Sequence, residues 1–272
     1  YMVRSDENAL SSLVGEKGHP HVEVRGDVSI AEDLSTVTVV YQVNEGPPAM
    51  VGDIYFRGNF RTRESVLHNE LGMKTGEPFS LKKMLKGQRD LRNMGLFKSV
   101  KVKALGLKEK RESVDLFIEV EEKRSYYWEL GGGYDSERGA FGNTRVGDSN
   151  LFGTNKDAWV GGEFSQIGYR VESRVREPRL FGSRVSATLG AFTEKREEFN
   201  QTFGTRTHGA SLGFYRKWTR ALGTGLTFRF EDRDQFRRRD VSSDHFLEDD
   251  SDQYRPRRIL VVTPTVLCDT RD

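Results

Sequence analysis

The chain has 272 residues and a net charge of +2 at pH 7, so its charge balance predicts no nucleic-acid partner. Hydrophobic residues make up 35% and charged residues 31%, a small apolar supply for a soluble core, and no apolar run approaches the ~18 residues of a membrane helix. A membrane barrel remains compatible, because its strands alternate apolar and polar residues.

The ends of the chain fall inside predicted elements. Tyr1 starts within a helical pattern, Asp272 follows a strand directly, and no secretory signal is visible. We therefore expect a fragment of a longer protein. The single cysteine, Cys268, excludes an internal disulfide and is interpreted as a small apolar strand residue.

Two segments 77 residues apart share one alternating pattern. Residues 36–48 (TVTVVYQVNEGPP) match residues 113–125 (SVDLFIEVEEKRS), with apolar residues at every second position. A candidate partner strand precedes each segment, so each predicts a hairpin. The repeat indicates two copies of one module, of which the first is incomplete.

The second copy reads as a complete β-α-α-β-β module. Residues 51–59 predict a strand that ends in a Gly-Asn turn, and Thr62 is predicted to cap a helix over 63–71. Ser80 is predicted to cap a second helix, with Gly95 at its C-terminal end. The apolar face of this second helix is predicted to consist of Leu81, Met84, Leu85, Leu91 and Met94. Two helices on one face of a three-stranded sheet follow from this order.

This order, with FRGNFRT and LRNMGLFKSVKV, resembles a POTRA domain, the periplasmic module of outer-membrane assembly proteins. The resemblance makes 48–124 a complete POTRA domain and 1–47 the last part of a preceding one. Its structural motif falls on Gly58, Gly95 and Phe97, which the residues alone explain as turn, cap and core positions. It implies that client chains bind by adding a strand to a sheet edge.

From residue 125 onward the helical periodicity gives way to strand alternation. About eight strands follow, as in 169–176, where Tyr and Val alternate with Arg and Glu, and in 222–231. Such alternation fits either a soluble sandwich or a membrane barrel. Four aromatic residues near predicted strand ends fit an interfacial girdle: Trp128, Trp159, Trp218 and Tyr215.

The predicted connections differ in length. Those at 179–184 and 218–223 are tight, whereas those at 194–206 and 231–256 are long and charged. Short turns at one end and long loops at the other are typical of bacterial outer-membrane barrels, which favours the barrel.

The segments DSNLFGTNKD, REPRLFGSRVS and TPTVLCDTRD resemble the barrel of the family of outer-membrane assembly factors that contains BamA and TamA. The implied fold is an α+β POTRA region followed, over 125–272, by half of an all-β antiparallel transmembrane barrel, about eight meander strands, open because the chain is a fragment. The closing residues Asp269, Thr270, Arg271 and Asp272 form the family barrel motif. From the residues alone they are a turn with an Asp-Arg ion pair.

The first predicted barrel strand, 126–134, has an aromatic face, which we expect to meet lipid, and three consecutive glycines, which weaken a strand. Directly after the POTRA domain, such a strand is predicted to form a weak seam that opens to client strands. The glycines equally fit relief of crowding or curvature of the sheet. The hypothetical client edge comprises Trp128, Leu130, Gly131, Gly132 and Gly133.

No catalytic constellation, cofactor motif or metal motif is found, so no enzyme is predicted. GGGYDSERG is not followed by a helix, which rules out a phosphate loop, and the five histidines lack metal-ligand spacing. The acidic residues Glu248, Asp249, Asp250 and Asp252 are of a type that binds divalent cations, but their spacing fits no calcium loop. A solvated or lipopolysaccharide-facing outer loop is the favoured interpretation.

The family resemblance implies a factor that inserts outer-membrane proteins without ATP, located in the bacterial outer membrane with its POTRA domains in the periplasm. Implied partners are unfolded outer-membrane protein clients, outer-membrane lipid and lipopolysaccharide, and periplasmic chaperones or accessory subunits. Three alternatives stay open: a two-partner secretion transporter, a soluble β-rich binding module and a membrane-anchored enzyme.

Overall fold

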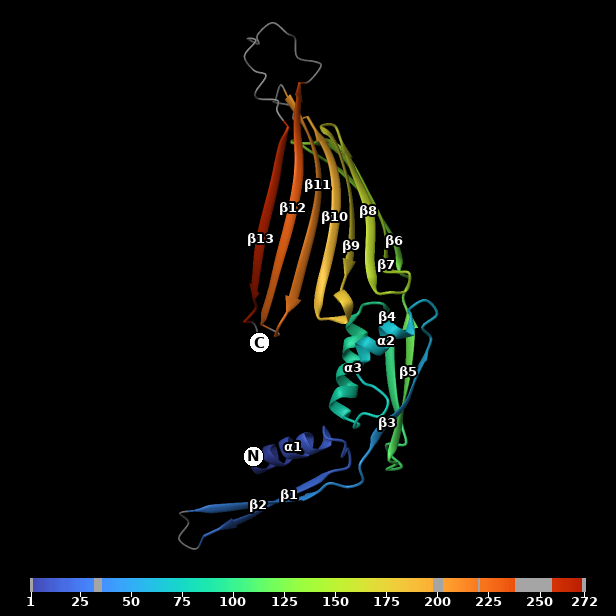
Figure 1. The fold of residues 1–272 in the computed structure, drawn as a ribbon, viewed down its shortest axis with the longest axis vertical. Helices are drawn as coiled ribbons and strands as arrows, with labels where there is room; N and C mark the ends of the chain where they lie inside the picture. Colours follow the sequence, from blue (N-terminus) through green and yellow to red (C-terminus); the bar gives the residue numbers. More distant parts are fainter. Residues whose placement is uncertain (1, 32–35, 198–202, 220, 238–255, 271–272) are drawn as a thin grey trace. The chain divides into compact units, whose positions relative to one another are not determined.

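The computed structural model divides the chain into two compact units, Tyr1–Lys123 and Arg124–Asp272 (Figure 1). Each unit is described by itself. The structure describes all residues except 1, 32–35, 198–202, 220, 238–255 and 271–272.

The first unit begins with a helix and a hairpin. Helix α1 (Met2–Gly15) precedes strands β1 (Glu23–Ile30) and β2 (Val37–Asn44), which pair antiparallel in continuous register. The Glu7 carboxylate accepts a hydrogen bond from the Gly26 amide at 2.7 Å and so ties the helix to the hairpin. The predicted first hairpin is confirmed.

The rest of this unit has the predicted β-α-α-β-β order. Its elements are β3 (Met50–Arg57), α2 (Glu64–Leu71), α3 (Leu81–Asn93), β4 (Phe97–Leu105) and β5 (Ser113–Glu122). Strand β5 lies at the centre of the three-stranded sheet, parallel to β3 and antiparallel to β4. The last strand of the module therefore holds its two neighbours together.

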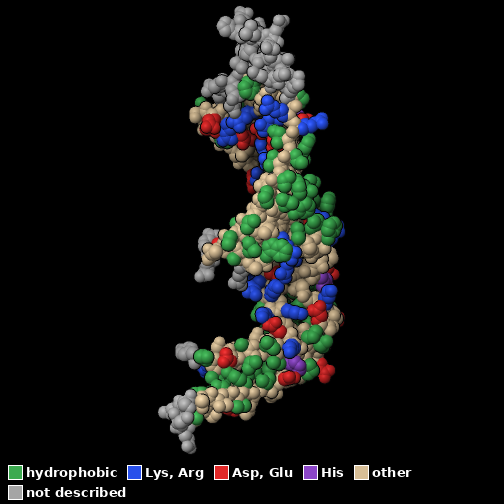
Figure 2. Space-filling view, turned by 60° about the vertical axis from the view of Figure 1, so that its left-hand side comes forward, with side chains coloured by type: hydrophobic (Ala, Val, Ile, Leu, Met, Phe, Trp, Pro, Cys, Tyr) green, Lys and Arg blue, Asp and Glu red, His purple; other side chains and the backbone are tan. Residues whose placement is uncertain are grey.

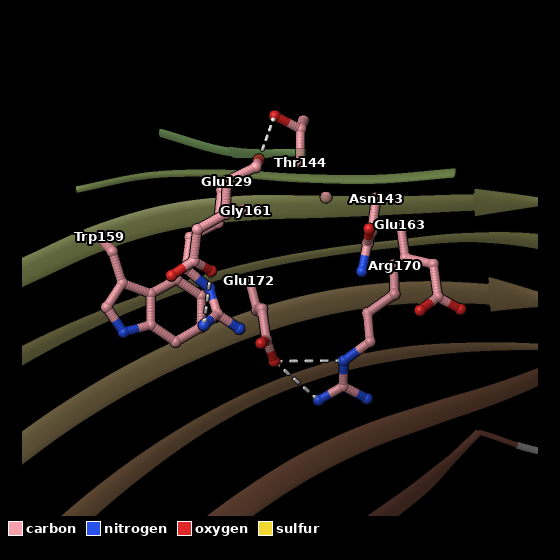
Figure 3. Close-up of a pocket in the computed structure, with 10 residues that line it drawn as sticks. Glu129, Asn143, Thr144, Trp159, Gly161, Glu163, Arg170 and Glu172 are labelled. Carbon is pink, nitrogen blue, oxygen red and sulfur yellow. Dashed lines mark hydrogen bonds and ion pairs between the residues drawn. The ribbon is translucent and has the colours of Figure 1, made fainter. Parts of the chain in front are cut away.

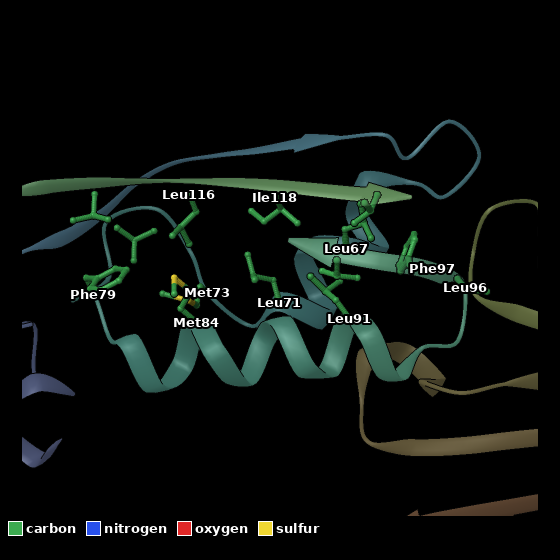
Figure 4. Close-up of a cluster of buried hydrophobic side chains, with 14 of the residues drawn as sticks. Leu67, Leu71, Met73, Phe79, Met84, Leu91, Leu96, Phe97, Leu116 and Ile118 are labelled. Carbon is green, nitrogen blue, oxygen red and sulfur yellow. The ribbon is translucent and has the colours of Figure 1, made fainter. Parts of the chain in front are cut away.

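Both helices pack on one face of this sheet, where the core of the unit lies (Figure 4). In α3 the core-facing positions are Met84, Gly87 and Leu91, spaced as one helical stripe. The predicted apolar face was wrong at Leu81 and Leu85, which are 48% and 46% exposed. Leu85 lies one position off the stripe, and Leu81 is the first residue of the helix.

The helix ends follow the sequence signals only in part. Ser80 caps α3, because its hydroxyl accepts the Lys83 amide at 3.2 Å. The predicted Thr62 cap of α2 is wrong, since Arg63 occupies that position without a side-chain cap. Thr62 is buried instead, and its amide and hydroxyl both donate to Glu122. A carboxylate 60 residues away thus outcompetes the local cap.

The second unit is one antiparallel sheet of eight strands in chain order. They are β6 (Tyr126–Asp135), β7 (Gly139–Leu151), β8 (Lys156–Ser165), β9 (Gly168–Glu177), β10 (Val185–Arg196), β11 (Phe203–Lys217), β12 (Leu222–Arg237) and β13 (Arg257–Cys268). The sheet is a meander with two open edges, β6 and β13, as predicted for a barrel half, and it is curved (Figure 1). A short 3-10 turn, η1 (Leu180–Gly182), lies between β9 and β10.

The connections are shorter than the sequence indicated. Strands β10, β11 and β12 extend into the segments predicted as long loops, so only 197–202 and 238–256 lie between strands there. These extensions are rich in charged residues, as in 194–196 and 231–237, and the sequence analysis interpreted that charge as a loop signal. At the same end the connections 136–138 and 166–167 are tight, and 197–202 is no longer than 178–184 at the other end, so the predicted length asymmetry holds for 238–256 alone.

In the described parts of the chain, no helix is both long and apolar enough to cross a membrane.

Candidate functional site: the two faces and the open edge of the sheet

One face of the eight-stranded sheet is apolar and exposed, and we name it the apolar face. Cross-strand pairing carries it from edge to edge, because paired residues point the same way. Figure 2 shows hydrophobic side chains gathered in a patch on the sheet. At the two edges of the apolar face, Trp128 on β6 is 71% exposed and Leu260 on β13 is 69% exposed. One full row consists of Trp128, Val146, Val160, Ser173, Ala191, Ala210, Phe230 and Leu260.

The apolar stretch shifts along the strands from one edge to the other. On β6 it spans Tyr126–Tyr134, centred on Leu130, whose row reaches Asp232 on β12. On β12 it spans Leu222–Phe230, and its centre, Leu226, lies six residues before Asp232. Strand β12 is six strands away from β6 in the sheet, so the stretch shifts by one residue per strand. At about 3.4 Å per residue and about 4.8 Å per strand, this shift corresponds to a strand tilt of about 35°. Barrel strands tilt by that amount.

The opposite face, here the polar face, carries a network of ion pairs. Arg170 bridges Glu172 at 3.1 Å and Glu194 at 3.0 Å. Glu231, with only 11% of its side chain exposed, lies between two arginines of its own strand, at 3.6 and 3.3 Å. The predicted polar set of β9 lies on this face: Arg170, Glu172, Arg174 and Arg176.

A cavity of about 220 Å³ opens on the polar face at β6 to β9 (Figure 3). Glu129, Trp159 and Glu172 line it, and the guanidinium of Arg145 lies 4.2 Å from the centre of the Trp159 ring. Arg174 approaches the same ring at 5.2 Å. The cavity is charged and open, which suits hydrogen bonding to a polar chain or water.

The predicted aromatic girdle was wrong for two of its four members. Trp159 pairs with Arg174 and Tyr215 with Gly225, and these pairs lie on the polar face. Trp128 lies on the apolar face, and so does Trp218, which directly follows β11 and donates a hydrogen bond to Thr224 on that face. The sequence could have shown that Trp159 lies on the polar face, because it is an even number of positions away from Asp157 and Glu163 in the same strand.

Aromatic rings of the polar face lie over glycines of neighbouring strands. A β-carbon added to Gly209 would collide with the Phe192 ring, and one added to Gly147 with the Tyr127 ring. Such pairs fill the gap that a strand glycine leaves and fix the register. Sequence reasoning missed them, because they depend on which residues face each other across strands.

Strand β6 forms one edge of the sheet and, in the described part of the chain, pairs only with β7. Its three central glycines have no positive φ. The space of Gly131 holds the Asn143 side chain, and a β-carbon on Gly133 would lie 2.9 Å from the Phe141 ring. This geometry favours the interpretation that the glycines relieve crowding.

The remaining predicted site residues fall outside the edge. Gly58 (φ +91°) and Gly95 (φ +77°) take turn conformations, and Phe97 is 3% exposed in the core of the first unit. The Asp269 amide donates to the Ala221 carbonyl at 2.7 Å, and Thr270 follows it after β13. Two further members of the closing motif, Arg271 and Asp272, lie outside the described residues.

Two expectations concern metals and charge. The acidic segment 248–252 lies outside the described residues. Among the residues that the structure describes, no group of three or more His, Cys, Asp or Glu side chains is placed to hold a metal ion. In the connection 136–138, the hydrogen bonds that Arg138 donates to Asp135 and Glu163 tie this turn to β8 and also raise the pKa of Arg138.

Comparison with known proteins gives two family matches and several relatives. The POTRA model, described as a surface antigen variable number repeat, matches 49–123, and the Omp85 superfamily domain matches 150–272. The outer membrane protein assembly factor BamA of Neorickettsia risticii is 26% identical over 198 residues, covering 72% of this chain. BamA of Neisseria meningitidis is 23% identical over 218 residues, covering 80%. The chain spans about a quarter of the length of these relatives, 26% in each case.

Solved structures agree in fold. BamA from Haemophilus ducreyi lacking POTRA domains 1–3 matches with a TM-score of 0.66 at 19% identity, covering 97% of this chain and 52% of that one. CdiB from Escherichia coli matches with a TM-score of 0.57 at 16% identity, covering 97% and 49%. The chain thus carries a POTRA domain followed by an open barrel half that matches the Omp85 superfamily domain, and it is similar to part of the outer membrane protein assembly factor BamA.

Proposed function

We propose that this chain is the junction segment of an outer-membrane protein assembly factor, in which β6 offers its free edge to incoming client strands. The observation that supports this most is the open edge of β6, four residues after the end of the POTRA sheet at Glu122. The POTRA match and the likeness to BamA support a location of the barrel half in the bacterial outer membrane and of the POTRA domain in the periplasm.

The mechanism follows from backbone hydrogen bonding. A strand in the hydrocarbon region must pair its amides and carbonyls, because no water is there to replace them. The free side of β6 therefore needs either another strand of the barrel or a client strand. Exchange between the two uses no ATP, since the client gains buried apolar surface and hydrogen bonds as it inserts.

The glycines of β6 contribute to this proposal by leaving space beside the strand. They let Asn143 and Phe141 fold over β6, and they leave the strand with few side chains of its own to hold a neighbour. The proposed client edge remains Trp128, Leu130, Gly131, Gly132 and Gly133.

The domain organisation and partners complete the proposal. Residues 1–47 are the end of a preceding POTRA domain, 48–124 are a complete one, and 125–272 are the first barrel half. Clients are unfolded outer-membrane proteins, received by strand addition at the POTRA sheet. Outer-membrane lipid, lipopolysaccharide and periplasmic accessory subunits are the further proposed partners.

A reversible crosslink tests the edge. In the full-length protein, with Cys268 replaced by Ser, Leu130→Cys is paired with a cysteine at the facing position of the last barrel strand. Strands lie about 4.8 Å apart, which permits a disulfide between facing positions. We expect oxidation to stop client insertion into vesicles and reduction to restore it. Unchanged insertion by the oxidised protein would exclude an opening β6 edge.

A second candidate is a two-partner secretion transporter, which is consistent with the likeness to CdiB. The two functions differ in client range. An assembly factor accelerates the insertion of unrelated barrel proteins, whereas a transporter exports one dedicated partner. Measuring the insertion of two unrelated barrel clients separates them.

A further inference from the structure

A groove in the first unit lies between helix α1 and helix α3. Its volume is about 550 Å³, and residues at the end of α1 and along α3 line it. The carboxylate of Glu16, which directly follows α1, accepts a hydrogen bond from Lys82 of α3 at 2.5 Å. This bond joins the two walls of the groove.

The α3 wall of the groove contains the two leucines of this helix that lie outside the core. It is formed by Leu81, Leu85, Gln88 and Arg92. These residues follow one another at steps of four, three and four, so they form a stripe of their own along the helix, beside the stripe that packs in the core. Leu81 and Leu85 are 48% and 46% exposed. An apolar side chain placed against them would therefore remove hydrophobic surface from water.

The charges of the groove are not balanced within it. Among the described residues that line it, Glu16 is the one acid, and Lys82 already pairs with it. Arg89 and Arg92 are exposed farther along the same wall, and neither forms an ion pair with a described residue. Two positive charges thus lie beside the apolar stripe, which favours an occupant that carries carboxylates.

Polar groups on both walls favour a peptide over the acyl chain of a lipid. Ser11 and Ser12 line the groove from α1, and Gln88 lines it from α3. An acyl chain would cover these groups without hydrogen bonds, whereas the polar side chains of a peptide can pair with them. A groove between two helices suits an amphipathic helix, whose apolar residues recur at spacings of three and four.

We propose that this groove is a docking site for an acidic amphipathic helix of a partner protein. Two apolar side chains of that helix cover Leu81 and Leu85. Carboxylates one turn farther along pair with Arg89 and Arg92. Helix α3 packs on a face of the POTRA sheet and not at its edge. Docking here is therefore separate from strand addition and from the proposed opening of β6, and each can fail without the other.

Cysteine labelling in the full-length protein tests whether the groove is accessible. On a background without other cysteines, Leu85→Cys and, as the reference, Lys86→Cys react with a water-soluble maleimide. Lys86 is exposed on the same helix and does not line the groove. We expect similar reaction rates at the two positions. A Leu85 position that is shielded from the reagent would mean that another part of the same chain fills the groove, which overturns the proposal.

A displayed library of random peptides of about 15 residues, or four helical turns, tests the chemistry of the partner. The target is the full-length protein in phospholipid nanodiscs. We expect the selected peptides to combine acidic residues with apolar residues at spacings of three and four. Leu85→Lys should weaken their binding about tenfold or more, because it places a charge against their apolar side. Leu105→Lys, at a leucine 53% exposed at the end of β4, should leave binding unchanged. Equal binding to both variants, or a selection without enriched peptides, overturns the proposal.

Charge reversal gives a second readout. The double variant Arg89→Glu, Arg92→Glu should lose the acidic peptides and should select basic ones, whereas Lys86→Glu should bind like the parent. All three residues are exposed, so urea unfolding should show the variants to be as stable as the parent. Acidic peptides that still bind the double variant overturn the proposal. Protection of the Leu85→Cys position from the maleimide by lysophosphatidylglycerol, but by no selected peptide, would assign the groove to a lipid and also overturns it.

Discussion

Glu122 shows how one side chain fixes a loop that carries no secondary structure. Its carboxylate accepts the Arg61 amide at 3.0 Å, the Thr62 amide at 2.7 Å and the Thr62 hydroxyl. Thr62 is 2% exposed, so water does not replace these bonds. The neighbouring Glu121 makes a surface pair with Lys98 at 3.1 Å, with both side chains more than half exposed.

We expect Glu122→Ala to lower the free energy of unfolding of residues 49–123 by about 2 kcal/mol, because buried donors lose a charged acceptor. Glu121→Ala, the matched control, should change it by less than about 0.5 kcal/mol, since exposed pairs contribute little. Urea unfolding followed by circular dichroism measures both. Equal losses in the two variants would contradict this assignment.

At the scale of elements, helix α3 separates apolar residues that sequence reasoning treated alike. Leu91 is fully buried in the core, whereas Leu85 is 46% exposed. Leu91→Ala should cost about 2–5 kcal/mol because it leaves a cavity. Leu85→Ala should cost under about 1 kcal/mol. The same urea titration checks both, and similar losses would mean that the helix is rotated from the position described.

The sequence predicted the helices and strands better than it predicted the contacts between distant residues and the ends of the strands. The two helices, the POTRA order and the meander depend on local periodicity and turn residues, which are readable in one chain. The Thr62 cap was wrong because the competing acceptor, Glu122, lies in a distant strand. The length of β12 was underestimated at 231–237, because six of these seven residues are charged or polar although the strand extends to Arg237.

The candidate site was predictable only in outline. Alternation in 169–176 assigned the faces of β9 without a structure. The fit of Asn143 and Phe141 over the glycines of β6 was out of reach, because it requires the register of β6 against β7. The positive φ of Phe152 (+55°) and Phe181 (+52°) was equally hidden, since Leu-Phe-Gly predicts a turn but not which residue takes the positive φ.

At the scale of the whole sheet, the tilt means that residues of one row lie at different depths in the membrane. Val160 and Phe230 share a row. Val160 lies at the centre of the apolar stretch of β8, whereas Phe230 lies at the far border of that of β12. The depth of a residue in the membrane, rather than its row in the sheet, should therefore determine how much stability is lost when a charged residue replaces it.

We expect Val160→Arg to cost about 2–4 kcal/mol in the membrane-inserted full-length protein, and Phe230→Arg about 0–1 kcal/mol from the charge, as measured for positions at the midplane and the border of barrels. Unfolding in urea from phospholipid vesicles measures the difference, with Val160→Ala and Phe230→Ala as size controls. If the two arginine variants lose equal stability relative to their alanine controls, the strands are not tilted as described.

The central place of β5 in the POTRA sheet has a mechanical consequence. Only residues 123–125 separate it from the first barrel strand, and it is hydrogen-bonded to β3 on one side and β4 on the other. Sheet hydrogen bonds run across the strands, so tension applied along β5 loads both ladders in shear, all at once, instead of opening them one by one. Force applied along the chain at the start of β6 would therefore reach the POTRA sheet without unravelling it.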